Sequence, residues 1–200
     1  MDAITKKNVK VRKLSRKIPI VAILLVFAGA MMGGPAAQAK PEVSHPGGQA
    51  AYVTPQSNEV YKRLVTIPWF SVFDNLDYSI QGHTVTVSGQ VVFPLTRSSV
   101  ASSLEGIPGV TRVVNNVTEL PFTPFDNQIR GAEYRTLFNY NSPLFRYSLG
   151  ATPQIHIIVD NGHVTLVGAV SSKMDRQIAG MRARSVPNVF SVTNDLQVVK

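Results

Sequence analysis

Aromatic and arginine side chains are interleaved between residues 128 and 149, and no other stretch of this chain has a composition so suited to binding. Glu133 is the only acid in it. Amphipathic rings beside cations are typical of the interface of a membrane that carries anionic headgroups. The stretch also holds more apolar groups than the one sheet-facing stripe of a helix can bury. The candidate lipid-binding residues are Arg130, Tyr134, Arg135, Phe138, Phe145 and Arg146.

The same stretch has two further interpretations. In the first, Tyr134, Leu137 and Phe138 simply cover a sheet while the arginines stay solvated. In the second, the surplus apolar groups pack against another part of the chain, and the aromatic segments Trp69–Phe70 and Phe122–Phe125 extend that surface. The residue types alone leave membrane contact and internal packing open.

The sequence offers little support for a catalytic function. The histidines are too scattered to form a ligand cluster, no serine lies in a nucleophile-elbow context, and no carboxylate pair accompanies a plausible base. The chain has no cysteine, which excludes disulfides and thiolate chemistry. We therefore expect no catalytic residue, no metal site and no cofactor, and an enzyme is the least favoured function. The four histidines are His45, His83, His156 and His163.

An internal repeat sets the architecture. The segment Val85–Val117 recurs without a gap as Val164–Leu196, 79 positions later. None of the shared residues is an evident nucleophile or metal ligand, so they are interpreted as framework. The shared set in the first copy is Val85, Thr86, Gly89, Val91, Arg97, Pro108, Val110, Val113 and Asn115.

Three of the repeated positions carry specific structural expectations. The glycine lies in a strand, where close backbone approach is expected, and we favour helix-to-sheet packing over a lipid-contacting surface. The arginine opens a helix and needs a partner: a headgroup phosphate, Asp175 or a carbonyl. The asparagine is unusual in a strand and is expected to satisfy backbone groups. These pairs are Gly89 and Gly168, Arg97 and Arg176, and Asn115 and Asn194.

Periodicity predicts the order helix, strand, strand, helix, strand in each copy. In the first copy a helix starts near Asn58, and Thr96 caps a second helix. In the second copy a helix runs from Asp175 to about Ser185. Its predicted buried stripe is Ile178, Ala179 and Met181.

These elements predict an α+β fold of two αββαβ modules, each a small three-stranded mixed sheet packed on two helices. Modules of this size are marginal alone, so packing of one module against the other should matter for stability. The predicted domains are a flexible lead-in over 40–56, a divergent first module over 57–120, a linker over 121–127 and a second module over 128–200.

The N-terminus resembles an export signal. Seven cations precede the apolar run Ile18–Met32, and small residues typical of a cleavage site follow at Ala36–Ala39. Cleavage near Ala39 would remove those cations and Asp2, lowering the net charge from +8 to +2 and weakening any nucleic-acid interpretation. The alternative is a retained membrane anchor, although the run is short of the roughly 20 apolar residues that span a bilayer.

The second copy resembles a BON domain in the run from Gly162 to Val170 and in Val186–Leu196 after the helix. The first copy is a weaker match, with Thr84 inserted after the turn and Phe93-Pro94 at the head of its helix. The resemblance implies an α+β sandwich, a periplasmic location, association with phospholipid membranes and no catalytic residues.

We therefore expect an exported, non-enzymatic binding module, periplasmic or secreted. Its partner would be an anionic phospholipid surface, bound peripherally, in envelope maintenance or an osmotic stress response. The alternative is a structural module that docks an envelope protein. The sequence leaves the oligomeric state open.

Overall fold

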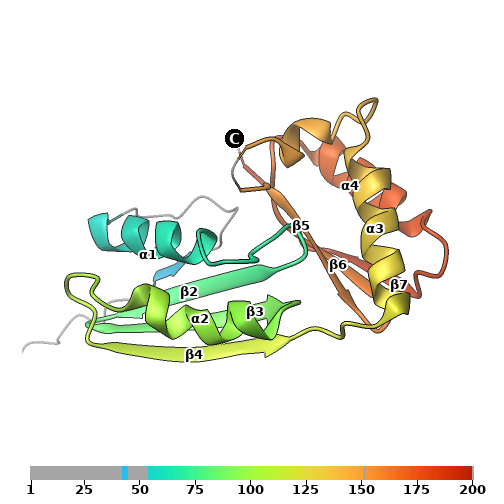
Figure 1. The fold of residues 1–200 in the computed structure, drawn as a ribbon. Helices are drawn as coiled ribbons and strands as arrows, with labels where there is room; N and C mark the ends of the chain where they lie inside the picture. The colour runs from blue at the N-terminus through green and yellow to red at the C-terminus, as the bar shows by residue number, and fades with distance from the viewer. Residues whose placement is uncertain (1–41, 45–53, 151, 200) are drawn as a thin grey trace, which may run out of the picture. The chain divides into compact units, whose positions relative to one another are not determined.

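The computed structural model describes residues 42–44, 54–150 and 152–199. The predicted signal peptide lies outside these residues. Among the described residues, no helix combines the length and apolar character that a membrane crossing requires. The two predicted modules are both present, and the α+β fold is confirmed (Figure 1).

The first module has two helices and a mixed sheet. Strands β2 and β3 form an antiparallel hairpin, and β3 pairs in parallel with β4. A short strand within the predicted lead-in, β1, adds to the free edge of β2, so this sheet has four strands. The elements are β1 (Glu42–Ser44), α1 (Pro55–Val65), β2 (Asn75–Gln81), β3 (Thr84–Val91), α2 (Pro94–Leu104) and β4 (Arg112–Glu119).

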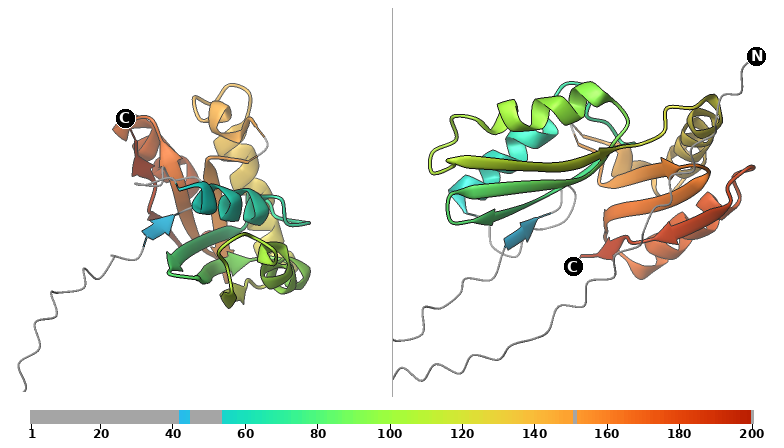
Figure 2. Two further views of the ribbon diagram at one scale, coloured as in Figure 1. Left: turned by 90° about the vertical axis from the view of Figure 1, so that its left-hand side faces the viewer. Right: turned by 90° about the horizontal axis from the view of Figure 1, so that it is seen from below.

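The second module repeats this topology. Strands β5 and β6 are antiparallel, while β7 and β8 both pair in parallel with β6 and act as one interrupted strand. Figure 2 shows its two long helices from further directions. The elements are α3 (Pro124–Phe138), the 3-10 turn η1 (Phe145–Ser148), β5 (Ile155–Asp160), β6 (His163–Val170), α4 (Lys173–Arg184), β7 (Ser191–Asn194) and β8 (Gln197–Val198).

Hydroxyl side chains cap three of the four α-helices of the described residues. Thr54, Thr123 and Ser172 each accept a hydrogen bond from the backbone N–H three residues on. Helix α2 is the exception, because Phe93 occupies its N-cap and makes no side-chain cap. The predicted cap Thr96 was wrong: its side chain is buried in the first turn and donates to the Pro68 carbonyl.

The repeated glycines serve strand pairing rather than the helix packing that we expected. Gly89 and Gly168 have φ of +123° and +117°. A Cβ at either position would lie 2.1 Å from a backbone carbonyl oxygen of the neighbouring strand segment, that of Asn75 or Gln154. Only glycine fits there, since both the conformation and the space exclude a side chain.

The repeated arginine and asparagine join each second helix to its last strand. Asn194 Nδ2 donates to the Arg176 carbonyl at 2.7 Å, and Arg176 Nη2 donates to the Asn194 carbonyl at 3.0 Å. In the first module Asn115 likewise donates to the Arg97 carbonyl, and Arg97 donates to Val117 O. The carbonyl partner expected for these arginines is thus confirmed in both copies.

The segment before β2 carries the contact between the modules. The Ile157 N–H, on the outer edge of β5, donates to the Val72 carbonyl at 2.8 Å, and Val72 belongs to the core of the second module. Val92, Leu120 and Ile158 form a separate buried cluster drawn from both modules. The predicted packing of one module against the other is therefore confirmed.

Candidate functional site

The six predicted lipid-binding residues divide into a buried pair and an accessible group. Phe138 is 5% exposed and belongs to the core of the second module, and Arg130 is 3% exposed. Neither side chain can reach a membrane while the module is folded, so we remove both from the predicted surface. The other four are Tyr134, Arg135, Phe145 and Arg146.

Arg130 is a structural cation. Its Nη2 donates to the Val159 carbonyl and its Nη1 to Asn127 Oδ1, each at 2.8 Å. Burial lowers the pKa of this guanidinium, while the charges of Asp126, Asp74 and Asp160 act in the opposite direction. The residue thus ties α3 to the end of β5.

The accessible predicted residues of α3 lie in its last turns. Arg135 is exposed, and Tyr134 is partly exposed with its ring edge-on to Phe138 at a centroid distance of 5.3 Å. The Phe73 ring also meets the Tyr134 ring edge-on, at a centroid distance of 6.3 Å. The Tyr134 ring therefore packs against two phenylalanines while the residue remains 42% exposed.

The loop after α3 adds a second aromatic pair. Tyr140 is 84% exposed, and its ring meets that of Phe145 edge-on at 5.6 Å. Phe145 opens the η1 turn and is half-buried. The two rings therefore lie in the short segment between the end of α3 at Phe138 and the start of η1 at Phe145.

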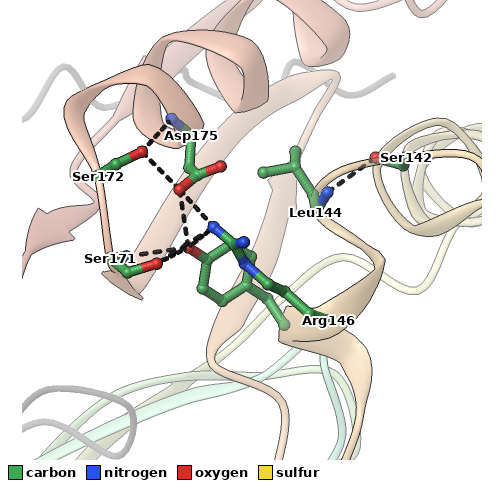
Figure 3. A network of polar contacts seen from close by, with 7 residues as sticks. Ser142, Leu144, Arg146, Ser171, Ser172 and Asp175 are labelled. Carbon is green, nitrogen blue, oxygen red and sulfur yellow. Dashed lines mark hydrogen bonds and ion pairs between the residues drawn. The ribbon is translucent and has the colours of Figure 1, made fainter.

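A polar network fixes Arg146 beside this pair (Figure 3). Its Nη2 donates to Asp175 Oδ2 at 2.7 Å, to the Tyr147 hydroxyl at 3.0 Å and to Ser171 Oγ at 3.2 Å. The side chain of Arg146 nevertheless remains 55% exposed, whereas that of Asp175 is 7% exposed. The network orients the cation while leaving much of it in water.

Asp175 is the centre of that network. Its carboxylate accepts hydrogen bonds from the Ser172 and Tyr147 hydroxyls at 2.6 and 3.0 Å. Burial raises the pKa of Asp175, but these hydrogen bonds and the charge of Arg146 outweigh it and leave the pKa below its ordinary value. The carboxylate is therefore ionised at neutral pH and is committed to holding η1 against α4.

The accessible residues form one candidate binding surface, which we call the α3–η1 surface. Between residues 134 and 149 the sequence has no acidic side chain. Exposed rings, an exposed leucine, the cation of Arg135 and the exposed part of Arg146, whose charge is paired with Asp175, suit an anionic, partly apolar partner. The surface comprises Tyr134, Arg135, Tyr140, Phe145, Arg146 and Leu149.

Residue patterns missed one group of interest inside α3. Glu133 is fully buried, and its carboxylate oxygens have no hydrogen-bond partner among the described residues. Burial raises the pKa of Glu133 to about 8. The acid is thus neutral at physiological pH and adds no negative charge beside the α3–η1 surface.

Within the described ranges, no group of three or more His, Asp or Glu side chains could hold a metal ion. His83 contacts the Gly109 carbonyl through Nδ1, and His163 contacts Ser191 Oγ. His156 is buried in β5 with its ring 5.7 Å from that of Phe70. His45 lies outside the described residues.

A family model for the BON domain matches residues 59–121 and 146–200, one copy in each module. The chain belongs to the BON domain family. BON domains are generally membrane-interacting, non-catalytic modules. The two matched copies confirm the tandem arrangement that the 79-residue repeat predicted.

No curated protein matches the chain. Among solved structures, it is similar to the C-terminal domain of CdsD, a structural protein of the type III secretion system of Chlamydia trachomatis. The two share 14% identity at a TM-score of 0.29, over 62% of this chain. The match spans 57% of the CdsD chain.

Proposed function

We propose that this BON-domain protein is a non-enzymatic module that binds anionic phospholipid surfaces peripherally through the α3–η1 surface. The observation that carries the proposal is the pairing of Tyr140 and Phe145 beside an Arg146 held in place by Asp175. Rings of this kind favour the headgroup region, and an oriented guanidinium favours phosphate. Each contribution is modest, so binding is reversible.

We also propose that the chain is exported, through cleavage of the predicted signal peptide near Ala39, and acts at the cell envelope in its maintenance or in osmotic stress. Support comes from the cationic and apolar pattern of residues 6–32 and from family membership. A net charge of only +2 after cleavage means that attraction depends on the local surface and not on the whole protein.

A second candidate function is docking of an envelope protein, on the α3–η1 surface or on a second exposed aromatic cluster. The exposed aromatic cluster of the first module favours it, because Trp69, Phe93 and Phe122 form a chain of rings with centroid distances of 6.0 and 5.5 Å. Large exposed aromatic groups are typical of interfaces between proteins as well as of membrane contacts.

Vesicle co-sedimentation separates the two functions. The chain from residue 40 onward, which retains every described element, is mixed with phosphatidylcholine vesicles containing a rising fraction of phosphatidylglycerol. Membrane binding predicts that the bound fraction rises with anionic lipid and falls between low and physiological salt. No binding at any composition would exclude the proposal and leave the protein partner as the remaining candidate.

A further inference from the structure

The second helix and last strand of each module border a groove that differs sharply in charge between the two copies. In the second module the groove lies between α4 and β7–β8, with a volume of about 660 Å³. It is lined by Lys173, Arg176, Gln177, Met181, Arg184 and Val198, together with Gly180 and Asn194. The corresponding groove in the first module lies between α2 and β4, with a volume of about 480 Å³.

The strand register matches the two grooves residue by residue. Val198 pairs with Val170 on β6, just as Glu119 pairs with Val91 on β3. The acidic Glu119 of the first groove is therefore replaced by a neutral valine in the second. The 79-residue offset also places Arg184 of the second groove at the position of Glu105, and Lys173 at that of Pro94.

These replacements change the charge pairing of the arginine that both copies share. In the first module Arg97 donates to Glu119 Oε1 at 3.2 Å, so its charge is neutralised within the groove. In the second module Arg176 keeps only its backbone contact with Asn194 O, at 3.0 Å. The side chains of Lys173 and Arg184 make no hydrogen bond or ion pair with other residues of the described ranges. Three cations thus line one groove that holds no acid.

The shape and the apolar lining point to an amphiphilic ligand. Gly180 lets the strand come close to the helix: a Cβ there would lie 2.8 Å from Asn194 Nδ2 and 3.5 Å from Arg184 Nη1. Met181 is 61% exposed on this face, so its predicted place in the buried stripe of α4 was wrong. The predicted Ala179 is buried, together with Gly180 and Ala183, and Ile178 packs against the core. Methionine and valine beside three cations suit a phosphate attached to an apolar body better than a free phosphate.

We propose that the α4–β7 groove of the second module holds the phosphate headgroup of an anionic phospholipid, with Arg176, Arg184 and Lys173 around the phosphate and Met181 and Val198 beside its glycerol end. The matched groove of the first module is closed to the same ligand by Glu119. This inference rests on the proposed function and assigns the headgroup to a defined site, separate from the α3–η1 surface.

One substitution tests the site without removing a cation. Val198→Glu places beside Arg176 the carboxylate that Glu119 provides in the first module. Val198→Gln is the neutral control of the same length. The probe is dihexanoyl phosphatidic acid, titrated into the isotope-labelled chain from residue 40 onward, with amide shifts followed by NMR. Dihexanoyl phosphatidylcholine and inorganic phosphate are titrated in parallel.

If the groove binds the headgroup, phosphatidic acid should cause saturable amide shifts at Arg176, Gly180 and Val198. It should cause none at Arg97 or Glu119. Val198→Glu should weaken the apparent affinity about fivefold, in line with the loss of about one arginine's attraction, and Val198→Gln should not. Equal saturation by inorganic phosphate would overturn the lipid assignment. Unchanged affinity in Val198→Glu, or shifts confined to other residues, would overturn the site, whereas vesicle binding by the same variant would leave the proposed function standing.

Discussion

Arg176 and Asn194 hold each other by their backbones, since each side chain donates to the carbonyl of the other residue. The first module repeats half of this exchange between Arg97 and Asn115. The clasp uses one carbonyl of β7 and one carbonyl of α4, and it fixes the last strand against the second helix. It uses one of the five N–H donors of Arg176, so the guanidinium keeps donors for a ligand in the proposed headgroup groove.

Replacing Asn194 should therefore destabilise the second module. Asn194→Ala deletes the bond to the Arg176 carbonyl and the acceptor for the Leu196 N–H. We expect a loss of about 1–2 kcal/mol in the free energy of unfolding, measured by urea denaturation. Asn115→Ala should cost a similar amount, because it makes the equivalent bonds. No change in either variant would show that the clasp is incidental.

Substitution of Gly168 should destabilise the second module more than substitution of Asn194. Gly168→Ala places a Cβ 2.1 Å from the Gln154 carbonyl oxygen in a backbone conformation with φ of +117°. We expect a loss of roughly 3 kcal/mol or more, visible as a lower denaturation midpoint. Gly82→Ala is the matched control, because it also has positive φ but meets nothing within 4 Å. The control should lose about 1 kcal/mol.

Buried Glu133 should make stability fall as the pH rises. Below its ordinary pKa of 4.5 the acid is protonated in both folded and unfolded chains, so it contributes nothing. Between pH 4.5 and about 8 the unfolded chain loses the proton while the folded chain retains it, which costs about 3 kcal/mol at pH 7. Glu133→Gln should match the wild type near pH 4 and exceed it at pH 8 in urea denaturation. Parallel pH profiles would contradict the assignment.

Two phenylalanines seven residues apart should separate folding from binding. Phe138→Ala empties a core position and should cost about 3–5 kcal/mol of stability. Phe145→Ala removes a half-buried ring from the α3–η1 surface, so we expect a small stability change and weaker vesicle binding. Thermal denaturation and co-sedimentation of both variants provide the comparison. Unaltered vesicle binding in Phe145→Ala would remove that ring from the proposed surface.

Much of the architecture could be predicted from periodicity and from the repeat, because both reflect local backbone preferences. The errors came from contacts across long distances in the chain. Arg130 is buried with its Nη1 and Nη2 donating to Asn127 and the Val159 carbonyl, and the charges of three aspartates favour its charged form. Its Nε has no partner among the described residues. Val72 enters the core of the other module through a pairing with β5 that no local pattern indicates.

The candidate site was predicted only in part, for a related reason. The composition of residues 128–149 predicts a candidate binding stretch, but the helical pattern does not show which arginine side chain is buried and which faces solvent. The cations of the α4 groove were missed although the signal was present in the sequence. At the 79-residue offset, Glu105 and Glu119 of the first copy become Arg184 and Val198 of the second.

The absence of cysteine allows the most direct test of the central claim. A single Asn141→Cys, exposed beside Tyr140, takes an environment-sensitive fluorophore, and Ser102→Cys on α2 provides the matched label on an exposed helix of the first module. Emission is recorded with vesicles of phosphatidylcholine alone and with added phosphatidylglycerol. We predict a blue shift for the label at 141 with anionic vesicles and none for the label at 102. Equal shifts at both positions, or none at 141, would contradict membrane binding through the α3–η1 surface.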